Sequence, residues 1–411
     1  MTAEDHTDES LEDVPVPVVD EPADGVPDVV ADAELLAKAA EAVRSGRGPV
    51  AIDAERASGY RYGQRAYLVQ LRREGAGTWL IDPIACPDLT TLEVAIGDAE
   101  WVLHAATQDL PCLAELGLRP RHLFDTELGG RLAGLPRVGL AAVVEHYLGV
   151  TLAKEHSAVD WSSRPLPEPW LRYAALDVEL LVEARDRLKE DLRRQGKLGW
   201  AEQEFAALTS FTGPPPRSEP WRRTSGMHKV RSRRQAALVR ELWQTRDEIA
   251  RTRDVSPGRV LPDSALIELA LREPHSGAEL GDIRARGARR YQRQWFAALR
   301  RGRALSEQDL PALTVRNDGP PPARVWADRD PVAAARLNET RETLKAFSEE
   351  NGVPVENLLT PDLLRRVLWS PPADTSVGGF AAALTEQGAR GWQVEITAPL
   401  LAHAVARHPG E

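Results

Sequence analysis

Two acidic residues at the end of an apolar segment are the first side chains in this sequence that could do chemistry. Asp53 and Glu55 directly follow Val50–Ile52, a segment that predicts a buried strand. Because residues i and i+2 of a strand point to the same face, the two carboxylates project together. Two acids this close repel each other unless a cation lies between them, which is compatible with a metal site. Solvated acids in a loop are the alternative interpretation.

Two further acids lie later in the chain, each on a predicted helix. Asp109 follows a strand predicted at residues 101–103 and opens a helix, where it could equally serve as a helix cap. Tyr173 and Asp177 are four residues apart in a helix predicted at 168–195, so they share one helix face. The tyrosine hydroxyl could orient a water molecule while Asp177 binds a metal. A tyrosine at the edge of the core beside a solvated aspartate has the same spacing.

The order of these residues is more specific than any one of them. Four carboxylates that converge on one site would suit two hard divalent cations, since Mg²⁺ prefers oxygen ligands. Two such cations about 4 Å apart can clamp the attacking and leaving oxygens of a phosphodiester. The sequence therefore suggests metal-assisted hydrolysis of a phosphodiester bond.

The elements that must position these residues alternate in type. Apolar segments at 50–52, 66–71, 78–81 and 100–103 predict strands, and a helix at about 109–116 and the long one at 168–195 follow. This order predicts an α/β domain.

Proline-rich segments at 213–220 and 319–322 predict two boundaries after this domain. The two blocks beyond them are nearly all helical. Val260-Leu261-Pro262-Asp263 in the first block resembles Leu359-Thr360-Pro361-Asp362 in the second, at an offset near 98 residues. We interpret the blocks as two related small helical domains, with coincidence as the alternative.

The net charge of −10 would argue against a nucleic-acid partner if the charge were evenly spread. It is not: residues 1–34 contain twelve acids and no Lys or Arg, which predicts a disordered acidic tail. Residues 217–303 contain 21 Lys and Arg against 10 Asp and Glu. A basic segment of this kind is compatible with binding to a phosphate backbone.

Taken together, the motifs resemble the ribonuclease D family, which belongs to the tyrosine subtype of the DEDD exonucleases. Besides the four acids and Tyr173, the resemblance includes Leu103-His104-Ala105, Phe124-Asp125-Thr126-Glu127, Gly139–Val144, Leu148–Lys154, Asp160-Trp161-Ser162 and Arg164-Pro165-Leu166. Residues 235–301 resemble the HRDC domain found in ribonuclease D and in RecQ-type helicases. The third block looks like a diverged second copy.

The resemblance implies an α/β ribonuclease H-like exonuclease domain followed by two small all-α HRDC-type domains. We place the acidic tail at 1–34, the exonuclease domain at 35–213, the HRDC domain at 220–303 and the second, HRDC-like domain at 322–411. The implied activity is 3′→5′ exoribonuclease action with two divalent metal ions, Mg²⁺ or Mn²⁺, releasing 5′-mononucleotides.

The resemblance also implies a role for each site residue. Asp53 would bridge both metals, and Glu55 and Asp177 would hold the metal that activates the attacking water. Asp109 would support the second metal, and Tyr173 would orient the nucleophile. His156 is the alternative to Tyr173, since the histidine subtype of these enzymes uses a catalytic His.

One segment departs from the family pattern. After Glu55 the family usually has hydrophobic residues that face the substrate, whereas this chain has residues 56–62, with Tyr60 and Tyr62. Either tyrosine could stack on a base, or both could be exposed loop residues.

Six arginines of the basic segment are candidates for backbone binding: Arg231, Arg233, Arg234, Arg286, Arg289 and Arg290. A solvated helix face is the alternative. The expected partner is a single-stranded RNA 3′ end, which includes transfer RNA precursors by family resemblance. The family resemblance points to a monomer. We expect a cytoplasmic location and no membrane partner, because no apolar run approaches the ~18 residues that span a bilayer.

The sequence also bears on several other classes of protein. A complete helicase is excluded by the lack of a Gly-x-x-x-x-Gly-Lys-Ser/Thr loop. A DNA exonuclease would use the same acids, because the metals contact phosphates and not sugars. A non-catalytic RNA-binding scaffold would be expected to have lost some of the acids. Cys86 and Cys112 are too few for a disulfide scaffold or a cysteine-based zinc finger, and we expect them to be buried and reduced.

Overall fold

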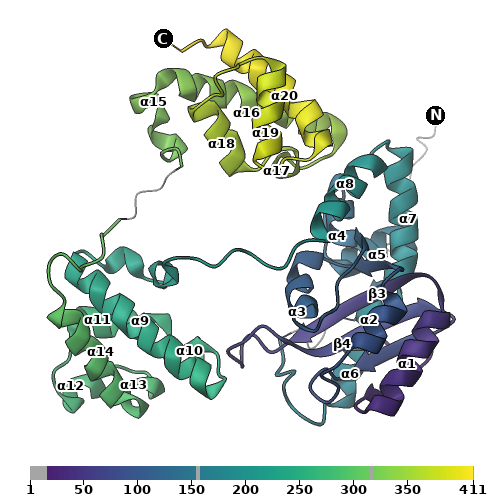
Figure 1. Cartoon of the computed structure of the whole chain (residues 1–411), viewed down its shortest axis with the longest axis horizontal. Helices are drawn as coiled ribbons and strands as arrows, with labels where there is room; N and C mark the ends of the chain where they lie inside the picture. The colour runs from purple at the N-terminus through teal and green to yellow at the C-terminus, as the bar shows by residue number, and fades with distance from the viewer. Residues whose placement is uncertain (1–15, 154–157, 315–318, 411) are drawn as a thin grey trace, which may run out of the picture.

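The computed structural model describes residues 16–153, 158–314 and 319–410. Figure 1 shows an α/β body followed by two helical blocks. This agrees with the α/β-then-helical architecture that the sequence predicts. None of the helices in the described ranges is long and apolar enough to cross a membrane.

A six-stranded mixed sheet forms the centre of the first body, in the order β2-β5-β4-β3-β6-β7. The pairs β3/β4 and β4/β5 are antiparallel, whereas β6 and β7 continue the sheet in parallel with β3. The strands span Val29–Val30 (β2), Arg47–Arg56 (β3), Ala66–Glu74 (β4), Gly77–Ile81 (β5), Glu100–Leu103 (β6) and His122–Asp125 (β7). The long central strand β3 therefore has partners on both sides.

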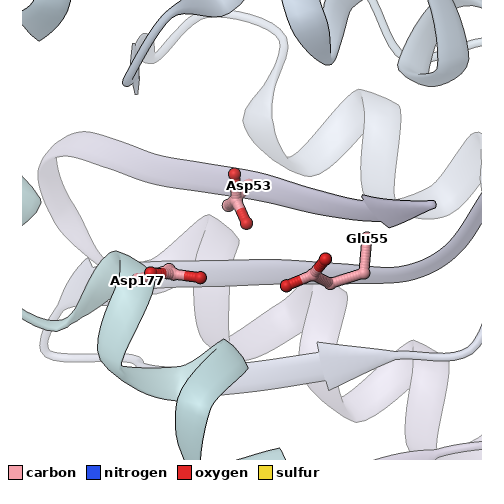
Figure 2. Close-up of side chains that lie close together, drawn as sticks. All are labelled: Asp53, Glu55 and Asp177. Atoms are coloured by element: carbon pink, nitrogen blue, oxygen red, sulfur yellow. The ribbon is translucent and has the colours of Figure 1, made fainter. Parts of the chain in front are cut away.

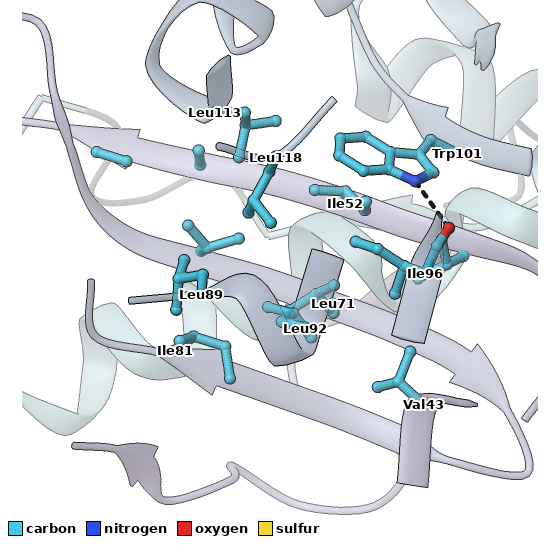
Figure 3. Packing of buried hydrophobic residues seen from close by; sticks show 14 of the residues in the cluster. Val43, Ile52, Leu71, Ile81, Leu89, Leu92, Ile96, Trp101, Leu113 and Leu118 are labelled. Atoms are coloured by element: carbon cyan, nitrogen blue, oxygen red, sulfur yellow. Dashed lines mark hydrogen bonds between the residues drawn. The ribbon is translucent and has the colours of Figure 1, made fainter. Parts of the chain in front are cut away.

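Each face of the sheet is covered by a different set of helices. On one face, Ile52 and the residues two positions before and after it on β3 pack against apolar side chains of α1, α2 and α3. Leu71 of β4 and Trp101 of β6 belong to the same cluster (Figure 3). Trp101 is fully buried, and its Nε1 donates to the Ile96 carbonyl at 3.2 Å. The opposite face of β3 carries Asp53 and faces α6 and α7. These helices span Ala33–Ser45 (α1), Thr90–Ile96 (α2), Leu110–Glu115 (α3), Glu168–Glu179 (α6) and Leu181–Arg194 (α7).

The remaining helices of this body lie around the end of the sheet at β7. They span Thr126–Leu132 (α4), Leu140–Leu148 (α5) and Leu198–Leu208 (α8). Both cysteines, Cys86 and Cys112, are free and buried, as predicted.

The structure corrects the prediction of a disordered tail for residues 16–34. Val18–Val19 forms β1, which pairs with β8 at Thr151–Leu152, and residues 29–30 form β2. Acids of this segment also find basic partners: Asp24 lies 3.0 Å from Arg72, and Glu21 lies 2.9 Å from Arg172. Composition alone missed these contacts because the arginines lie far away in the sequence. Residues 1–15 lie outside the described ranges.

The two helical blocks share an order of elements. Their helices span Arg233–Arg253 (α9), Pro257–Val260 (α10), Asp263–Arg272 (α11), Gly277–Gly281 (α12), Arg286–Arg290 (α13) and Gln292–Ala304 (α14), then Trp326–Arg329 (α15), Pro331–Asn351 (α16), Val355–Leu358 (α17), Pro361–Trp369 (α18), Val377–Glu386 (α19) and Gly391–Arg407 (α20). Helices α16, α17 and α18 begin 98 residues after α9, α10 and α11 respectively. This correspondence supports our interpretation of the third block as a second HRDC-like copy, which stays a proposal.

Candidate active site

Three of the predicted carboxylates converge where β3 and α6 face each other. Asp53 and Glu55 project from the same face of β3, and Asp177 projects toward them from α6 (Figure 2). One carboxylate oxygen from each residue lies within 4.8 Å of the others. The small buried residues Ala174 and Ala175 allow α6 to approach the sheet closely. Oxygen donors at this spacing suit a hard divalent cation.

Asp109 lies beside this group of three. It follows a left-handed residue, Ala105 (φ 57°), and a short 3₁₀ helix at the end of β6. Its side chain makes no capping hydrogen bond to α3, so capping does not explain it. The nearest cation is Arg56, whose Nη2 lies 3.9 Å from Asp109 Oδ1.

Burial disfavours the charged forms of all four acids, and repulsion between carboxylates adds to it at Glu55, Asp109 and Asp177. Burial raises the pKa of Asp53 to about 6. Burial, with added repulsion from neighbouring carboxylates, holds the pKa values of Glu55, Asp109 and Asp177 well above their ordinary range. Without a cation the group therefore retains protons to higher pH than exposed acids would, and cation binding would favour the charged forms.

Tyr173 lies next to Asp177 on the same face of α6, as the spacing predicts. Its hydroxyl lies near the Asp177 carboxylate, and its pKa is raised above the ordinary tyrosine value, chiefly by burial and then by the acids around it. Its ring packs 6.4 Å from the ring of Trp161, which is fully buried. Tyr173 thus remains neutral, with its ring held against Trp161. The alternative residue, His156, lies outside the described ranges.

One residue that positions the site was not singled out from the sequence. Asp125, at the end of β7, accepts hydrogen bonds from the backbone amides of Ala105 (3.1 Å) and Ala106 (2.9 Å). It also caps the first turn of α4. Its carboxylate therefore fixes the turn that leads to Asp109. The signal was present as an Asp at a helix start within Phe124-Asp125-Thr126-Glu127.

The two loop tyrosines contact the second block. Tyr62 Oη donates to Asp247 of α9 at 3.0 Å. The Arg259 guanidinium of α10 lies 4.1 Å from the centre of the Tyr60 ring. The loop between β3 and β4 is thus a docking contact between domains, beside the strand that carries Asp53.

The candidate backbone-binding arginines fall into two groups. Arg233 donates to the carbonyls of Glu307 and Leu310, and Arg234 donates to three carbonyls at the end of α14. These two side chains therefore hold the second block together.

The second group lies on or near α13 and is exposed. Arg290 lies 5.5 Å from the centre of the Tyr291 ring, and Arg253 of α9 lies 5.3 Å from it. Arg286 is exposed nearby, whereas Arg289 donates to the Gly281 carbonyl. Arg231 is exposed just before α9. The predicted role of these residues in RNA binding stays a prediction.

Family models match three parts of the chain. Residues 27–193 match the 3′-5′ exonuclease family, 235–299 match the HRDC domain, and 319–405 match the 3′ to 5′ exonuclease C-terminal domain. The second of these matches agrees with the HRDC domain expected from the sequence.

Curated relatives and solved structures also include ribonuclease D proteins. The ribonuclease D of Gluconacetobacter diazotrophicus is 31% identical over 79% of this chain and 82% of its own length. That of Bartonella henselae is 27% identical over 65% of this chain, which spans 64% of that relative's length. Among solved structures, a protein from Bifidobacterium adolescentis matches with a TM-score of 0.86 and 40% identity, over 95% of this chain and 100% of that one. Escherichia coli RNase D, described as an exoribonuclease involved in structured RNA processing, matches with a TM-score of 0.68 and 26% identity, over 93% and 99%.

Proposed function

This chain belongs to the ribonuclease D family of 3′→5′ exoribonucleases, and from that premise we propose that it shortens RNA from the 3′ end by hydrolysis with two divalent metal ions. The observation that carries the proposal is the convergence of Asp53, Glu55 and Asp177 within 4.8 Å, inside the part of the chain that matches the exonuclease family. The fold implies the use of divalent metal. The choice of Mg²⁺ or Mn²⁺ and the count of two are our proposal.

The donor set fits such ions. It consists of carboxylate oxygens, which hard divalent cations prefer, and a bound cation would offset the burial that raises the pKa values of Asp53 and Glu55. When bound, the cations would favour deprotonation of an attacking water and stabilise the leaving 3′ oxygen. Asp53 would contact both ions, Glu55 and Asp177 would hold one, and Asp109 would support the other. Tyr173 would donate its hydroxyl proton in a hydrogen bond and orient the attacking water.

The finer details of substrate are also proposals. A single-stranded 3′ end would enter the site, and each turnover would release a 5′-mononucleotide. Transfer RNA precursors are our candidate substrates, and we propose that the chain works as a monomer in the cytoplasm. The exposed arginines around Tyr291 would add affinity for the phosphate backbone without reading its sequence.

The direct test is to replace single acids and follow the 3′ end. In Asp177→Asn or Asp53→Asn, we expect the cleavage rate on labelled RNA with Mg²⁺ or Mn²⁺ to fall by about 10²–10⁴-fold, a size typical for loss of a catalytic group. Asp98→Asn is the matched control, because Asp98 is 93% exposed and pairs with Arg121 on the surface. Unchanged shortening of RNA by the first two variants would contradict the assignment. A DNA oligonucleotide of matched sequence separates ribonuclease from deoxyribonuclease action.

A further inference from the structure

A buried glutamine beside the acids has no partner for its polar atoms. Gln70 lies in β4 and is fully buried, with neither Oε1 nor Nε2 hydrogen-bonded to any described residue. An unsatisfied buried polar group costs about 1–3 kcal/mol, so native proteins contain few of them. Such a group next to a functional site calls for a physical explanation.

The register of the sheet places Gln70 directly opposite Asp53. The two residues are antiparallel partners on β4 and β3. Directly opposite residues project from the same face, with Cβ atoms about 4.5–5.5 Å apart. That face is the one covered by α6, which carries Asp177. The Gln70 amide is therefore within reach of the carboxylate group.

Two other neighbours of Gln70 on this face are apolar, and a third, Arg72 two residues later on β4, pairs with Glu179 of α6 at 3.1 Å. Leu80 is its partner on β5, and Leu68, two residues earlier on β4, lies opposite Glu55. Leu68, Leu80 and Ala174 of α6 belong to one apolar cluster. The apolar side chains cannot satisfy an amide, and the Arg72 guanidinium already pairs with Asp24 and Glu179. The acceptor that the strand register offers to the Gln70 amide is the Asp53 carboxylate directly opposite.

We propose that Gln70 is a positioning residue of the metal site, whose Nε2–H donates to the Asp53 carboxylate when a divalent cation is bound. Its Oε1 then remains available for a water molecule in the site. A group that orients a metal-binding carboxylate typically changes metal affinity by about 10- to 100-fold. The inference rests on the proposed function only in taking Asp53, Glu55 and Asp177 to hold a divalent cation.

The test compares Gln70→Leu with the unsubstituted full-length chain. Titration calorimetry with Mn²⁺ measures the dissociation constant, and thermal melts in EDTA measure the stability without metal. We expect the Mn²⁺ dissociation constant to rise by about 10- to 100-fold. The melting temperature in EDTA should stay the same or rise, because leucine removes an unsatisfied amide from the core. The rise in melting temperature that Mn²⁺ produces should shrink accordingly.

Leu71→Met is the matched control. Leu71 is the next residue of β4, faces the other side of the sheet and belongs to the core under α1 and α2. This volume-conserving change should leave the Mn²⁺ dissociation constant unchanged. Gln70→Met, which is close in length and lacks the amide, should weaken Mn²⁺ binding as the leucine variant does.

Two results would overturn the role of Gln70. One is an unchanged Mn²⁺ dissociation constant in both Gln70 variants. The other is loss of the folded state in EDTA, which would show that the amide serves the fold without metal. Absence of Mn²⁺ binding by the unsubstituted chain would contradict the proposed function as well. If the unsubstituted chain binds Mn²⁺ tightly and Gln70→Leu binds it equally tightly, only the proposed role of Gln70 is contradicted.

Discussion

The two helical blocks contact the exonuclease body in different ways. The third block shares an apolar core with it: Phe205 of α8 and Leu192 of α7 belong to the same cluster as Leu401 of α20. Trp200 and Trp392 stack with ring centres 5.0 Å apart, and Trp392 Nε1 donates to Glu204 at 2.9 Å. This contact resembles the interior of a single domain.

The backbones of these two regions also approach closely. A Cβ added at Gly134 would lie 2.7 Å from the carbonyl oxygen of Gly352, and Gly134 has a φ of 82°. Lys197 Nζ donates to the carbonyls of Leu132 and Asn351, one from each region. Any larger residue at 134 would separate these surfaces.

The second block is held by polar contacts to one loop. Besides the contact of Tyr62 with Asp247, Asp254 lies 3.7 Å from both Arg61 and Arg65. Its own core is complete without the exonuclease body, from which only Tyr62 packs against it among the described residues. The same loop also contacts the exonuclease body, because Arg61 Nε donates to the hydroxyl of Ser162, which lies before α6.

This difference indicates which part of the molecule can move. The third block and the exonuclease body should unfold together, because they bury a common core. The HRDC domain should fold separately and detach at a modest cost, since exposed ion pairs contribute about 0–1 kcal/mol each. Its docking loop lies beside the acids, so its position can affect how RNA reaches them.

The largest expected effect is the loss of a core tryptophan. Trp392→Ala should destabilise the exonuclease body and the third block together by about 3–5 kcal/mol. Trp295→Ala should have a similar effect confined to the HRDC domain, where Trp295 is fully buried. Urea melts followed by far-UV circular dichroism and by residual cleavage of a short RNA would distinguish the two variants.

The cleavage result tests whether the third block unfolds with the exonuclease body while the HRDC domain does not. Under mild urea we expect Trp392→Ala to lose cleavage and Trp295→Ala to keep it on a short substrate. Loss of cleavage in both variants at the same urea concentration would show that the HRDC domain is part of the same cooperative unit.

A second effect concerns the pH dependence of stability, and it should be confined to the unit that the exonuclease body forms with the third block. At low pH the site acids are protonated in both the folded and the unfolded chain. As pH rises past 3.8, Asp53 ionises first in the unfolded chain, since its folded pKa is about 6. Stability without metal is therefore lost over this window, on the order of 3 kcal/mol from Asp53 alone. The three other acids extend the loss to higher pH.

The check is a comparison with Asp53→Asn in EDTA. The variant cannot ionise at this position, so it should be more stable than the parent chain at pH 7.5 and similar to it at pH 4. Asp98→Asn serves again as the exposed control. A variant that is less stable than the parent at pH 7.5 would contradict the raised pKa.

The smallest effect is expected at the docking loop. Removing the Tyr62 hydroxyl with Tyr62→Phe should cost about 0.5–1.5 kcal/mol of docking free energy. Small-angle scattering should show a larger radius of gyration for this variant. The difference should grow when Asp254→Asn is combined with it, because that change removes the ion pairs with Arg61 and Arg65, and added salt should then affect the double variant less than the parent. Glu268→Gln, which breaks a pair with Arg272 inside the block, is the control and should leave the radius unchanged. An unchanged radius in the double variant would indicate a rigid junction.

Much of the site is predictable from the sequence because the relevant periodicities are local. Asp53 and Glu55 are two residues apart on a strand, and Tyr173 and Asp177 are four apart on a helix, so each pair shares one face of its element. The exonuclease and HRDC domains are predicted from the resemblance of longer motifs to the ribonuclease D family.

The features that the sequence did not predict depend on contacts between residues far apart in the chain. Arg234 looked like a phosphate ligand but donates to the end of α14, some 70 residues away in the chain. Residues 16–34 looked disordered, although Arg72 and Arg172 pair with their acids. The place of Gln70 opposite Asp53 depends on strand register, which neither segment specifies alone.

The most direct test of the metal site is a crystal structure of the full-length chain soaked in Mn²⁺, with anomalous diffraction recorded at the manganese edge. We predict two anomalous peaks, both in contact with Asp53, one bound by Glu55 and Asp177 and the other on the side of Asp109. Peaks elsewhere, or no peak at these carboxylates in crystals whose parent solution cleaves RNA, would contradict the proposed metal site.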